Sequence, residues 1–458
     1  MPRRSIAIVG AGFSGTLLAA HLLLAHRADI RIHLIERNPQ FGRGLAYATG
    51  NANHLLNVRA SRMSAFADRP DHFMEWLRAN APDGAPVPDG DSFVSRRLFG
   101  AYVQGLLAEI LWGSGHAANL FLVNDAAVAV ERKGARWLVR TEGGRPVTAD
   151  AVVLAVGNFP PEPPYAEDNG VYASERFHPD PWGPDVFEGL AADAPVLLIG
   201  TGLTMVDTLV SLSDRGHAGP VHALSRRGLV PRRHLHTEAA PLPIAWPPSP
   251  SVARLLKEFR AHVRARGAHS WAESVDALRP VTQELWQAMP LPEQERFLRH
   301  LRPWWDVHRH RLAPKVADLV DGARLSERLV LHRGRILRLE RAEGGVAVTW
   351  RARGAAETQR LEVERIINCS GPSCDYARIR DPLVMDLMAK GLIRPDPLKL
   401  GLDVDARDGL VGEDGRSTPG LFGVGPVTRA RWWEVTAVPD IRVQSERLAH
   451  TLVGLFGP

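Results

Sequence analysis

Two glycine-rich turns, 190 positions apart, are the feature that most constrains the fold of this chain. Residues 10–15 (GAGFSG) follow the apolar run 5–9, and residues 200–205 (GTGLTM) follow the apolar run 195–199. A glycine turn between a strand and a helix lets the backbone approach a pyrophosphate, which the N-terminal end of the helix then binds. A second β-like run follows each turn. The sequence therefore predicts an α/β fold with two Rossmann-like dinucleotide-binding domains.

The residues at the ends of these second strands indicate which dinucleotide each domain binds. The first strand ends on Glu36, 26 positions after the first glycine of its turn, and the second ends on Arg226 and Arg227 at the same spacing. A strand-end carboxylate binds ribose hydroxyls, whereas a strand-end arginine accommodates a 2′-phosphate. We therefore expect FAD in the first domain and NADPH in the second. The alternative for the two arginines is a solvated strand end with no specific role.

Each glycine of the first turn has its own expected role. Gly10 permits the tight turn, Gly12 lets the pyrophosphate approach, and Gly15 lets the helix pack on the strand. The second turn has Met205 where a third glycine would stand, which loosens the packing requirement. The residues expected to contact FAD are Gly10, Gly12, Ser14, Gly15, Glu36, Arg43, Gly157 and Gly425. The residues expected to contact NADPH are Gly200, Gly202, Thr204, Arg226 and Arg227.

The distribution of apolar, proline-rich and helical stretches predicts the domain organisation. A stiff, proline-rich stretch at 159–164 cannot pair in a sheet and indicates an interdomain connection. The run 365–369 resembles the small-residue strand that precedes Gly157, so we interpret it as a return to the FAD domain. The FAD-binding domain is thus predicted to be discontinuous, with the NADPH-binding domain inserted. Its first segment is 1–160 and its second is 326–458, and between them lie a linker at 161–193 and the NADPH-binding domain with a helical segment at 194–325.

The composition excludes several classes of function. The net charge is +5, but basic and acidic residues are interspersed and no basic arm is present, so we expect no nucleic-acid partner. The apolar runs are too short to span a bilayer, so no membrane partner is expected. The first strand begins a few residues after Met1, which leaves no room for a leader peptide. These features favour a cytoplasmic protein, and the oligomeric state is left open.

The two cysteines and the run 308–311 could be taken for chemical sites, but we interpret both as structural. Cys369 and Cys374 have the spacing of a redox disulfide, but they follow a strand and bracket a Gly-Pro pair, so buried or half-buried thiols are the favoured interpretation. The run 308–311 (HRHR) has no carboxylate or cysteine cluster beside it, so we expect a charged helix face and no metal site.

Several further segments resemble those of a known protein family. They include stretches around a Gly-Arg-Gly sequence, an Asn-Val-Arg sequence and a closing Trp-Glu-Val-Thr sequence. In residue numbers they are 41–47 (FGRGLAY), 54–66 (HLLNVRASRMSAF), 71–73 (DHF), 305–311 (WDVHRHR) and 433–442 (WEVTAVPDIR). Together they resemble a group of bacterial FAD/NAD(P)-binding flavoprotein monooxygenases that includes FAD-dependent urate hydroxylases and aspartate N-monooxygenases.

The resemblance implies a single-component monooxygenase. NADPH would reduce FAD, and the reduced flavin would react with O₂. A C4a-hydroperoxyflavin would then hydroxylate a small polar, nitrogen-containing substrate, for which an anion is favoured. This chemistry belongs to the cofactor and needs neither a catalytic triad nor a metal. Two alternatives stay open: an FAD-dependent NADPH reductase or dehydrogenase that oxygenates nothing, and an FAD-binding redox sensor.

The same segments supply candidates for groups near the flavin. Asn57 is the candidate for a catalytic polar side chain that faces the flavin. Arg59, Arg429 and Arg431 are candidates to bind an anionic substrate, with surface or phosphate-contacting arginines as the alternative. The backbone N–H groups of Gly423 and Gly425, with the helix after 439, are expected near the pyrimidine end of the flavin.

Overall fold

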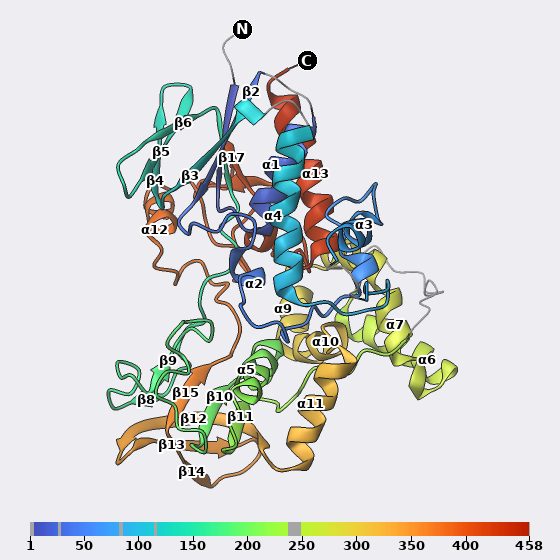
Figure 1. Ribbon diagram of the computed structural model, residues 1–458, viewed down its shortest axis with the longest axis vertical. Coiled ribbons are helices and arrows are strands. Elements are labelled where there is room, and N and C mark those ends of the chain that lie inside the picture. Colours follow the sequence, from blue (N-terminus) through green and yellow to red (C-terminus); the bar gives the residue numbers. More distant parts are fainter. Residues whose placement is uncertain (1–3, 26–28, 82–85, 114–116, 237–248, 458) are drawn as a thin grey trace. The chain divides into compact units, whose positions relative to one another are not determined.

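The fold is that of a computed structural model that describes residues 4–25, 29–81, 86–113, 117–236 and 249–457. It divides into two compact units (Figure 1). Unit 1 comprises residues 1–52, 58–159 and 374–458, and unit 2 comprises residues 53–57 and 160–373. Each unit is built on its own mainly parallel β-sheet. The predicted α/β class with two Rossmann-like domains is confirmed.

The sheet of unit 1 has six strands in the order β16-β17-β7-β1-β2-β3. All neighbours are parallel except β16 and β17, which are antiparallel. The central strand β1 follows directly into the first glycine turn. The strands are β1 (Arg4–Val9), β2 (Ile30–Glu36), β3 (Leu120–Asn124), β7 (Ala151–Leu154), β16 (Gly409–Val411) and β17 (Ser417–Gly423).

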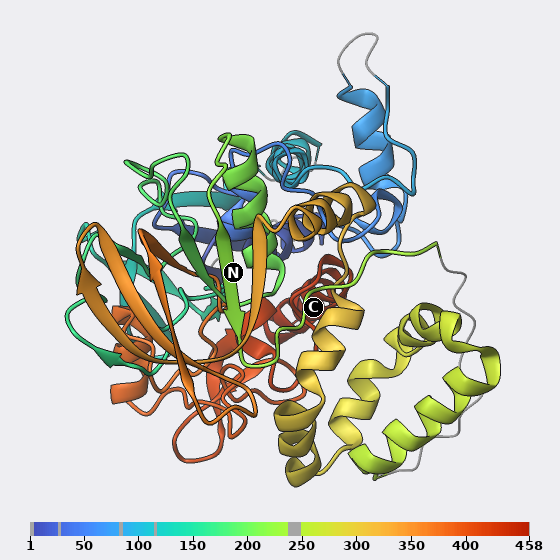
Figure 2. The same ribbon diagram turned by 90° about the horizontal axis from the view of Figure 1, so that it is seen from below.

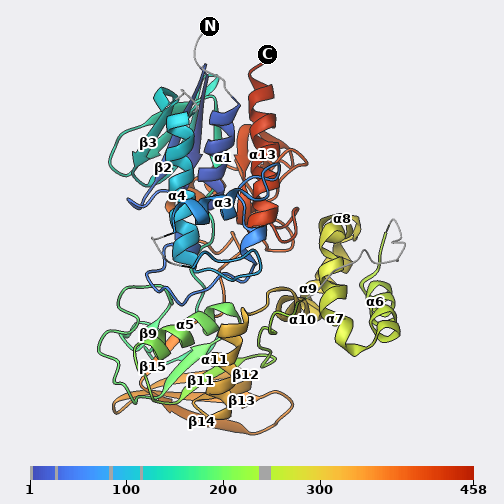
Figure 3. The same ribbon diagram turned by 45° about the vertical axis from the view of Figure 1, so that its right-hand side comes forward.

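Helices and a small second sheet cover this sheet. The helix α1 that opens after the glycine turn packs beside α13 and α4 (Figure 3). A three-stranded antiparallel sheet and α12 share a core with alternate β1 residues, Ala7 and Val9. The helices are α1 (Phe13–Leu24), α2 (Gly44–Tyr47), α3 (His72–Ala79), α4 (Arg96–Gly113), α12 (Pro382–Ala389) and α13 (Val438–Leu455), and the small sheet is β4 (Ala127–Lys133), β5 (Arg136–Thr141) and β6 (Val147–Ala149).

Unit 2 repeats the parallel arrangement around the second glycine turn. Its sheet runs β14-β13-β12-β11-β10-β15-β9, with β8 also paired to β12. The strands from β12 to β9 are parallel, whereas β12, β13 and β14 form an antiparallel meander. The strands are β8 (Glu167–Asp168), β9 (Phe177–His178), β10 (Val196–Ile199), β11 (Val221–Ser225), β12 (Leu329–Ala342), β13 (Gly345–Ala352), β14 (Thr358–Val363) and β15 (Arg365–Asn368).

Alternation along β10 divides the core of unit 2 into two layers. Val196 and Leu198 pack against α5 (Leu203–Asp214) and α11 (Pro314–Leu325). Leu197 and Ile199 pack on the opposite face, with residues of the meander. Successive side chains of a strand point to opposite faces, so a strand with all four residues apolar is buried on both sides.

The helical segment predicted within 194–325 is present and is drawn in yellow in Figure 2. Arg311, just after its last helix, is fully buried and donates to both carboxylate oxygens of Asp276 at 3.0 and 2.9 Å. Its guanidinium also lies 5.1 Å from the ring centre of Trp271. The expectation of a charged helix face is therefore wrong for Arg311, which ties this segment together. The helices are α6 (Val252–Arg266), α7 (Trp271–Ala277), α8 (Thr282–Ala288), α9 (Leu291–His300) and α10 (Arg302–Arg309).

The compact units differ from the predicted domain boundaries. The strands from β12 to β15 belong to the sheet of unit 2, so the return to unit 1 comes at Cys374 and not at position 326. The stretch 161–193 also belongs to unit 2, where it supplies β8 and β9. The reason for the error is the internal repeat. In unit 2, β15 stands beside β10 just as β7 stands beside β1 in unit 1, and the two strands look alike in sequence.

Candidate cofactor-binding sites

The first glycine turn is packed so closely that side chains are excluded. Gly10 has φ +100°, and a Cβ on it would lie 2.3 Å from the carbonyl oxygen of Ala155. A Cβ on Gly15 would lie 1.9 Å from the carbonyl oxygen of Gly10. Such contacts cannot be relieved by a small side-chain movement because both partners are backbone. The turn is therefore held against the end of β7, and α1 starts directly after it.

The segment 42–44 crosses the same turn. The Gly42 N–H donates to the Ala11 carbonyl at 2.8 Å, and a Cβ on Gly44 would lie 3.0 Å from the Cα of Gly12. Arg43 lies between these glycines and donates through Nε to Gln104 Oε1 at 2.9 Å. The structure thus brings Arg43, a predicted FAD contact, beside the predicted phosphate-binding turn.

Glu36 is joined directly to the turn. Its Oε2 accepts from the N–H of Ala11 at 2.8 Å, and its Oε1 accepts from the N–H of Asn38 at 3.1 Å. A carboxylate at this strand end is the group that binds ribose hydroxyls in dinucleotide folds. Gly157, with φ +69°, follows β7, and a Cβ there would meet no atom within 4 Å. The geometry therefore leaves open space at Gly157 and a hydrogen-bonding carboxylate at Glu36.

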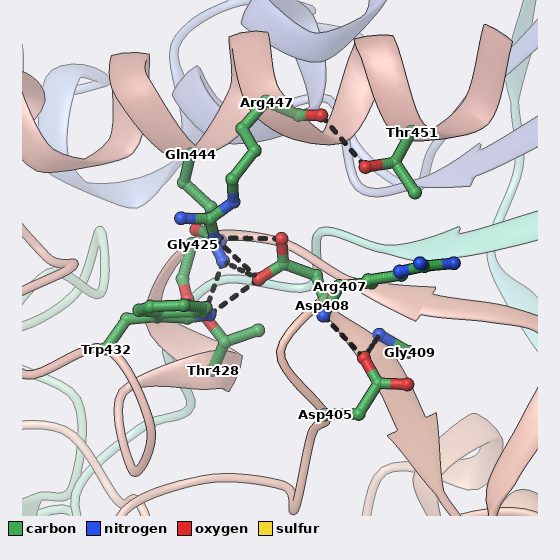
Figure 4. Close-up of polar contacts among 10 residues, drawn as sticks. All are labelled: Asp405, Arg407, Asp408, Gly409, Gly425, Thr428, Trp432, Gln444, Arg447 and Thr451. Atoms are coloured by element: carbon green, nitrogen blue, oxygen red, sulfur yellow. Dashed lines mark hydrogen bonds and ion pairs between the residues drawn. The ribbon is translucent and has the colours of Figure 1, made fainter. Parts of the chain in front are cut away.

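The C-terminal segment of unit 1 adds Gly425 to this arrangement. Gly425 has φ +77°, and a Cβ on it would lie 2.3 Å from Ser14 Oγ, in the first turn of α1. Its N–H donates to Gln444 Oε1 at 2.8 Å (Figure 4). The N–H of Gly423 donates to the Asp408 carbonyl at 2.9 Å. The expectation that these two N–H groups face a flavin is therefore wrong, because both are bonded within the protein.

The buried carboxylate of Asp408 holds the segment around Gly425 in place, and the sequence analysis did not predict this role. Asp408 is fully buried at φ +64° and accepts from Trp432 Nε1 at 2.6 Å, Gln444 Nε2 at 2.8 Å and Arg447 Nη2 at 2.9 Å. Burial raises the pKa of the Asp408 carboxyl, and the neighbouring Arg447 opposes that effect. Gln444 thus links Asp408 to the Gly425 turn. In sequence, Asp408 looks like an ordinary loop aspartate, so no local signal marks it.

The second glycine turn copies the construction of the first. Gly200 has φ +111°, and a Cβ on it would lie 2.4 Å from the carbonyl oxygen of Cys369, at the end of β15. A Cβ on Gly202 would meet no atom within 4 Å, which leaves open space beside the start of α5. Met205 is fully buried in the core in place of a third glycine. Both glycine turns thus provide a cradle of backbone that a dinucleotide requires.

The structural register corrects the predicted alignment of the two strand ends. The Gly10 N–H donates to the Ile35 carbonyl at 2.8 Å, and the Gly200 N–H donates to the Leu224 carbonyl at 2.8 Å. The counterpart of Glu36 is therefore Ser225, and Arg226 lies one residue further on. The shift arises because the connection through α5 is one residue shorter than the connection through α1.

The two predicted arginines are placed differently. Arg226 is exposed, and it makes no hydrogen bond or ion pair within the portion of the chain that the structure describes. Arg227 is half-buried and donates to the carbonyl of Arg299 at 3.2 Å. Thr204 lies in the first turn of α5. Arg226 thus offers its guanidinium to a ligand more freely than Arg227 does.

Comparisons with known proteins agree with this architecture. Residues 7–159 match a protein family described as FAD-NAD(P)-binding. Over its whole length the chain is 24% identical to an uncharacterised protein of Mycobacterium tuberculosis, 96% of which is covered. It is 27% identical to an L-aspartate N-monooxygenase (nitrosuccinate-forming) of Streptomyces cremeus, over 49% of this chain and 39% of that protein.

Solved structures extend the likeness to the complete fold. The ornithine N-hydroxylase of Kutzneria sp. 744 superposes with a TM-score of 0.66 at 15% identity, covering 100% of both chains. The L-lysine 6-monooxygenase of Pseudomonas syringae gives 0.66 at 16% identity, covering 98% of this chain and 99% of that one. The chain therefore has the fold of these two proteins. The predicted FAD- and NAD(P)-binding class, and the predicted likeness to flavoprotein monooxygenases, are confirmed.

Asn57 belongs to the short segment 53–57, which is part of unit 2. The backbone carbonyl of Asn57 lies 3.1 Å from His234 Nε2, which donates to it in the protonated-Nε2 tautomer. In the same segment His54 is buried, and its Nε2 lies 3.0 Å from the Asp207 carbonyl oxygen and 2.9 Å from Ser211 Oγ, both on α5. The catalytic role of Asn57 stays a prediction.

The three candidate substrate-binding arginines all lie in unit 1. Arg59 forms an ion pair with Asp91 at 3.0 Å. The guanidinium of Arg429 lies 4.9 Å from the ring centre of Trp433, and that of Arg431 lies 5.4 Å from the ring centre of Trp432. Each guanidinium is thus oriented by a protein partner. Their binding of a substrate stays a prediction.

The remaining sequence candidates are structural. Both cysteines are free; Cys369 is buried beside Thr208 Oγ1 at 3.3 Å, and burial raises the pKa of its thiol to about 12. The prediction of buried or half-buried thiols is confirmed, because Cys369 is buried and Cys374 is half-buried. In the described ranges, no three metal-binding side chains come together, and no helix is long and apolar enough to cross a bilayer.

Proposed function

We propose that this protein is an NADPH- and O₂-dependent FAD monooxygenase that hydroxylates a nitrogen atom of a small, polar, anionic substrate. One observation carries the proposal. Two glycine turns of the same construction are followed by opposite chemistry at the strand end, a carboxylate at Glu36 and a serine with arginines from Ser225 onward. A protein with two such sites is suited to pass electrons from one dinucleotide to another.

The geometry of unit 1 favours FAD as its ligand. Glu36 already accepts from the turn, and its negative charge would attract ribose hydroxyls and repel a 2′-phosphate. The backbone of the first turn and the start of α1 would hold the pyrophosphate. When bound, FAD would supply the transfer of electrons to O₂ and the oxygenating chemistry. Gly10, Gly12, Ser14, Gly15, Glu36, Arg43 and Gly157 are the residues proposed to hold it, with Gly425 acting through its contact with Ser14.

The geometry of unit 2 favours NADPH. Ser225 places no carboxylate at the ribose end, and the exposed guanidinium of Arg226 presents planar donors suited to a phosphate. The space beside Gly202 admits the pyrophosphate next to the first turn of α5, where Thr204 lies. Arg227 would contribute less, because its guanidinium is engaged by Arg299.

The substrate class comes from the relatives and from the charged side chains of unit 1. The Streptomyces relative is named for L-aspartate, and the two similar structures are named for ornithine and lysine. An amino acid of this kind carries a carboxylate that an arginine binds bidentately. Arg59, Arg429 and Arg431 are the residues proposed for that contact, and Asn57 for a polar contact near the flavin.

The cysteines weigh against a dithiol reductase. Reduction of a disulfide needs an accessible thiolate, and the thiol of Cys369 is buried with its pKa raised to about 12. A reductase that passes electrons to another carrier would still use both dinucleotide sites. Oxygen chemistry therefore has to be measured directly.

The first test uses the purified, FAD-loaded chain in two steps. Anaerobic mixing with NADPH is expected to bleach the flavin absorbance, faster than mixing with NADH at equal concentration. Aerobic NADPH oxidation is then followed with aspartate, ornithine, lysine and urate, with hydrogen peroxide measured in parallel. A substrate that speeds NADPH oxidation without a matching rise in peroxide supports the proposal. Flavin that NADPH does not reduce, with or without these compounds, contradicts it.

A further inference from the structure

The loop that carries the two strand-end arginines of unit 2 is held by a series of side-chain hydrogen bonds. The N–H of Gly228 donates to Ser225 Oγ at 3.0 Å, and Ser225 Oγ lies 2.9 Å from Thr201 Oγ1. Thr201 Oγ1 donates in turn to the carbonyl of Leu229 at 2.5 Å. The loop 225–229 is thus bonded at both ends to Thr201, which lies between Gly200 and Gly202.

The direction of each hydrogen bond in this series is fixed. A hydroxyl has one proton to donate, and that of Thr201 goes to Leu229. The proton between the two hydroxyls must therefore come from Ser225, whose oxygen accepts from Gly228. Each of the two hydroxyls thus donates one hydrogen bond and accepts another, and Thr201 is 5% exposed. Removing the Thr201 hydroxyl would leave two groups without their partner.

The first glycine turn has no equivalent device. Ala11 stands where Thr201 stands and has no hydroxyl, and the strand-end Glu36 takes the Ala11 N–H instead. The two turns are otherwise built alike, on Ala155 in one unit and on Cys369 in the other. The difference therefore falls at the strand end, where a dinucleotide fold distinguishes a ribose hydroxyl from a 2′-phosphate.

The other side of the loop is also constrained. Gly228 has φ +61°, and a Cβ on it would lie 3.1 Å from the Cβ of Arg333 on β12. Arg333 is the register partner of Ser225 across β11 and β12. The turn at Gly228 lies against β12 while Thr201 anchors the loop at Ser225 and Leu229. Arg226 is then the exposed member of an otherwise anchored loop.

We propose that Thr201 is a positioning residue for coenzyme selectivity, acting through Ser225 and Leu229 on the loop that presents Arg226. The inference rests on the proposed NADPH site. The hydroxyl of Thr201 is already engaged by Ser225 and Leu229, so its proposed role is indirect. Its hydroxyl fixes the loop in advance, so that a 2′-phosphate meets an ordered guanidinium and binding costs less conformational entropy. NAD⁺ has no 2′-phosphate, so its affinity does not depend on whether the loop that presents Arg226 is ordered.

The test measures the affinities of NADP⁺ and NAD⁺ for the FAD-loaded protein by calorimetry. Thr201→Val keeps the shape and removes the hydroxyl, and Thr201→Ser restores it. Ser225→Ala breaks the same series at another residue, which covers a failure of Thr201→Val to fold. Thr208→Val is the matched control, because Thr208 is 4% exposed and its Oγ1 bonds to Thr204 and Cys369 within the same unit.

We expect Thr201→Val and Ser225→Ala to raise the Kd of NADP⁺ about tenfold and that of NAD⁺ less than about twofold, because the loop that presents Arg226 is then no longer ordered before binding. Thr201→Ser and Thr208→Val should keep the wild-type ratio of the two Kd values. An unchanged ratio in both Thr201→Val and Ser225→Ala, or an equal loss for both dinucleotides, overturns the role of Thr201. A wild-type protein without preference for NADP⁺ overturns the NADPH site itself, and the inference with it.

Discussion

The backbone N–H of Ala11, in the first glycine turn, donates a 2.8 Å hydrogen bond to the carboxylate of Glu36. The bond joins the loop after β1 to the end of β2, so the group proposed to bind the ribose is already oriented before any ligand arrives. In unit 2 the same place is taken by the hydroxyl pair of Thr201 and Ser225. The contrast between a carboxylate and a hydroxyl pair underlies the proposed assignment of FAD and NADPH.

Glu36→Ala is expected to weaken FAD binding about thirtyfold. Hydrogen bonds to a charged group contribute about 1.5–3 kcal/mol, and about 2 kcal/mol corresponds to that factor. The Kd is measured by flavin fluorescence on protein stripped of FAD and reloaded. Glu142→Ala, at an exposed position of the same unit, serves as the control and should bind FAD as the wild type does. Equal FAD affinity in the wild type and Glu36→Ala would refute the role of Glu36.

Arg226→Ala is expected to raise the KM for NADPH about tenfold or more and to leave that for NADH nearly unchanged, because only NADPH carries the 2′-phosphate. Arg227→Ala should have the smaller effect, since Arg227 is held by the Arg299 carbonyl. Steady-state kinetics with both coenzymes check this. An equal loss with NADPH and NADH would remove Arg226 from the phosphate site.

Gly425→Ala is expected to destabilise the protein by about 2–4 kcal/mol, because φ is +77° and the new Cβ would lie 2.3 Å from Ser14 Oγ. Gly454→Ala, in the last turn of α13 with no atom within 4 Å of its Cβ, should instead stabilise by up to about 0.5–1 kcal/mol. Thermal unfolding of both variants compares the two. Similar Tm values for both would contradict the close packing of Gly425 on α1.

His21 supplies a prediction for acid. Burial lowers the pKa of its imidazole to about 4, from 6.5. The unfolded chain then binds a proton at His21 between pH 6.5 and 4 that the folded protein does not, so stability is lost as the pH falls through that window. His21→Phe removes the titrating group and keeps a ring beside Phe66.

The measurement for His21 is the Tm at pH 7.5 and pH 5. We expect a smaller loss of Tm between these values in His21→Phe than in the wild type. His300→Gln, at an exposed position, should lose as much as the wild type does. If His21→Phe loses as much as the wild type, the histidine does not contribute to acid sensitivity.

The sequence predicted those features that depend on short local patterns. Gly10 and Gly200 lie where the motif places them, each against the end of a neighbouring strand. The equivalence of Ser225 and Glu36 was missed because residue spacing does not reveal a connection that is one residue shorter. It emerges only in the hydrogen bonds to Ile35 and Leu224.

Long-range packing accounts for the other misses. The sequence of β15 resembles that of β7 because both strands pair with the strand before a glycine turn, so the pattern alone could not tell which sheet it joins. Asp408 and Gln444 are 36 residues apart and meet only in the folded protein. The hydrogen bond from the Gly425 N–H to Gln444 Oε1 also depends on long-range packing, so the sequence did not predict it.

In the proposed reaction, one oxygen atom of O₂ enters a nitrogen-containing substrate while NADPH is oxidised. The most direct measurement incubates the FAD-loaded protein with NADPH, ¹⁸O₂ and the compound that most accelerates NADPH oxidation, and analyses the product by mass spectrometry. We predict one ¹⁸O atom in the product for each NADPH consumed in productive turnover, and none from labelled water. NADPH oxidation that yields only labelled hydrogen peroxide or a reduced carrier, with that compound recovered unchanged, would contradict it.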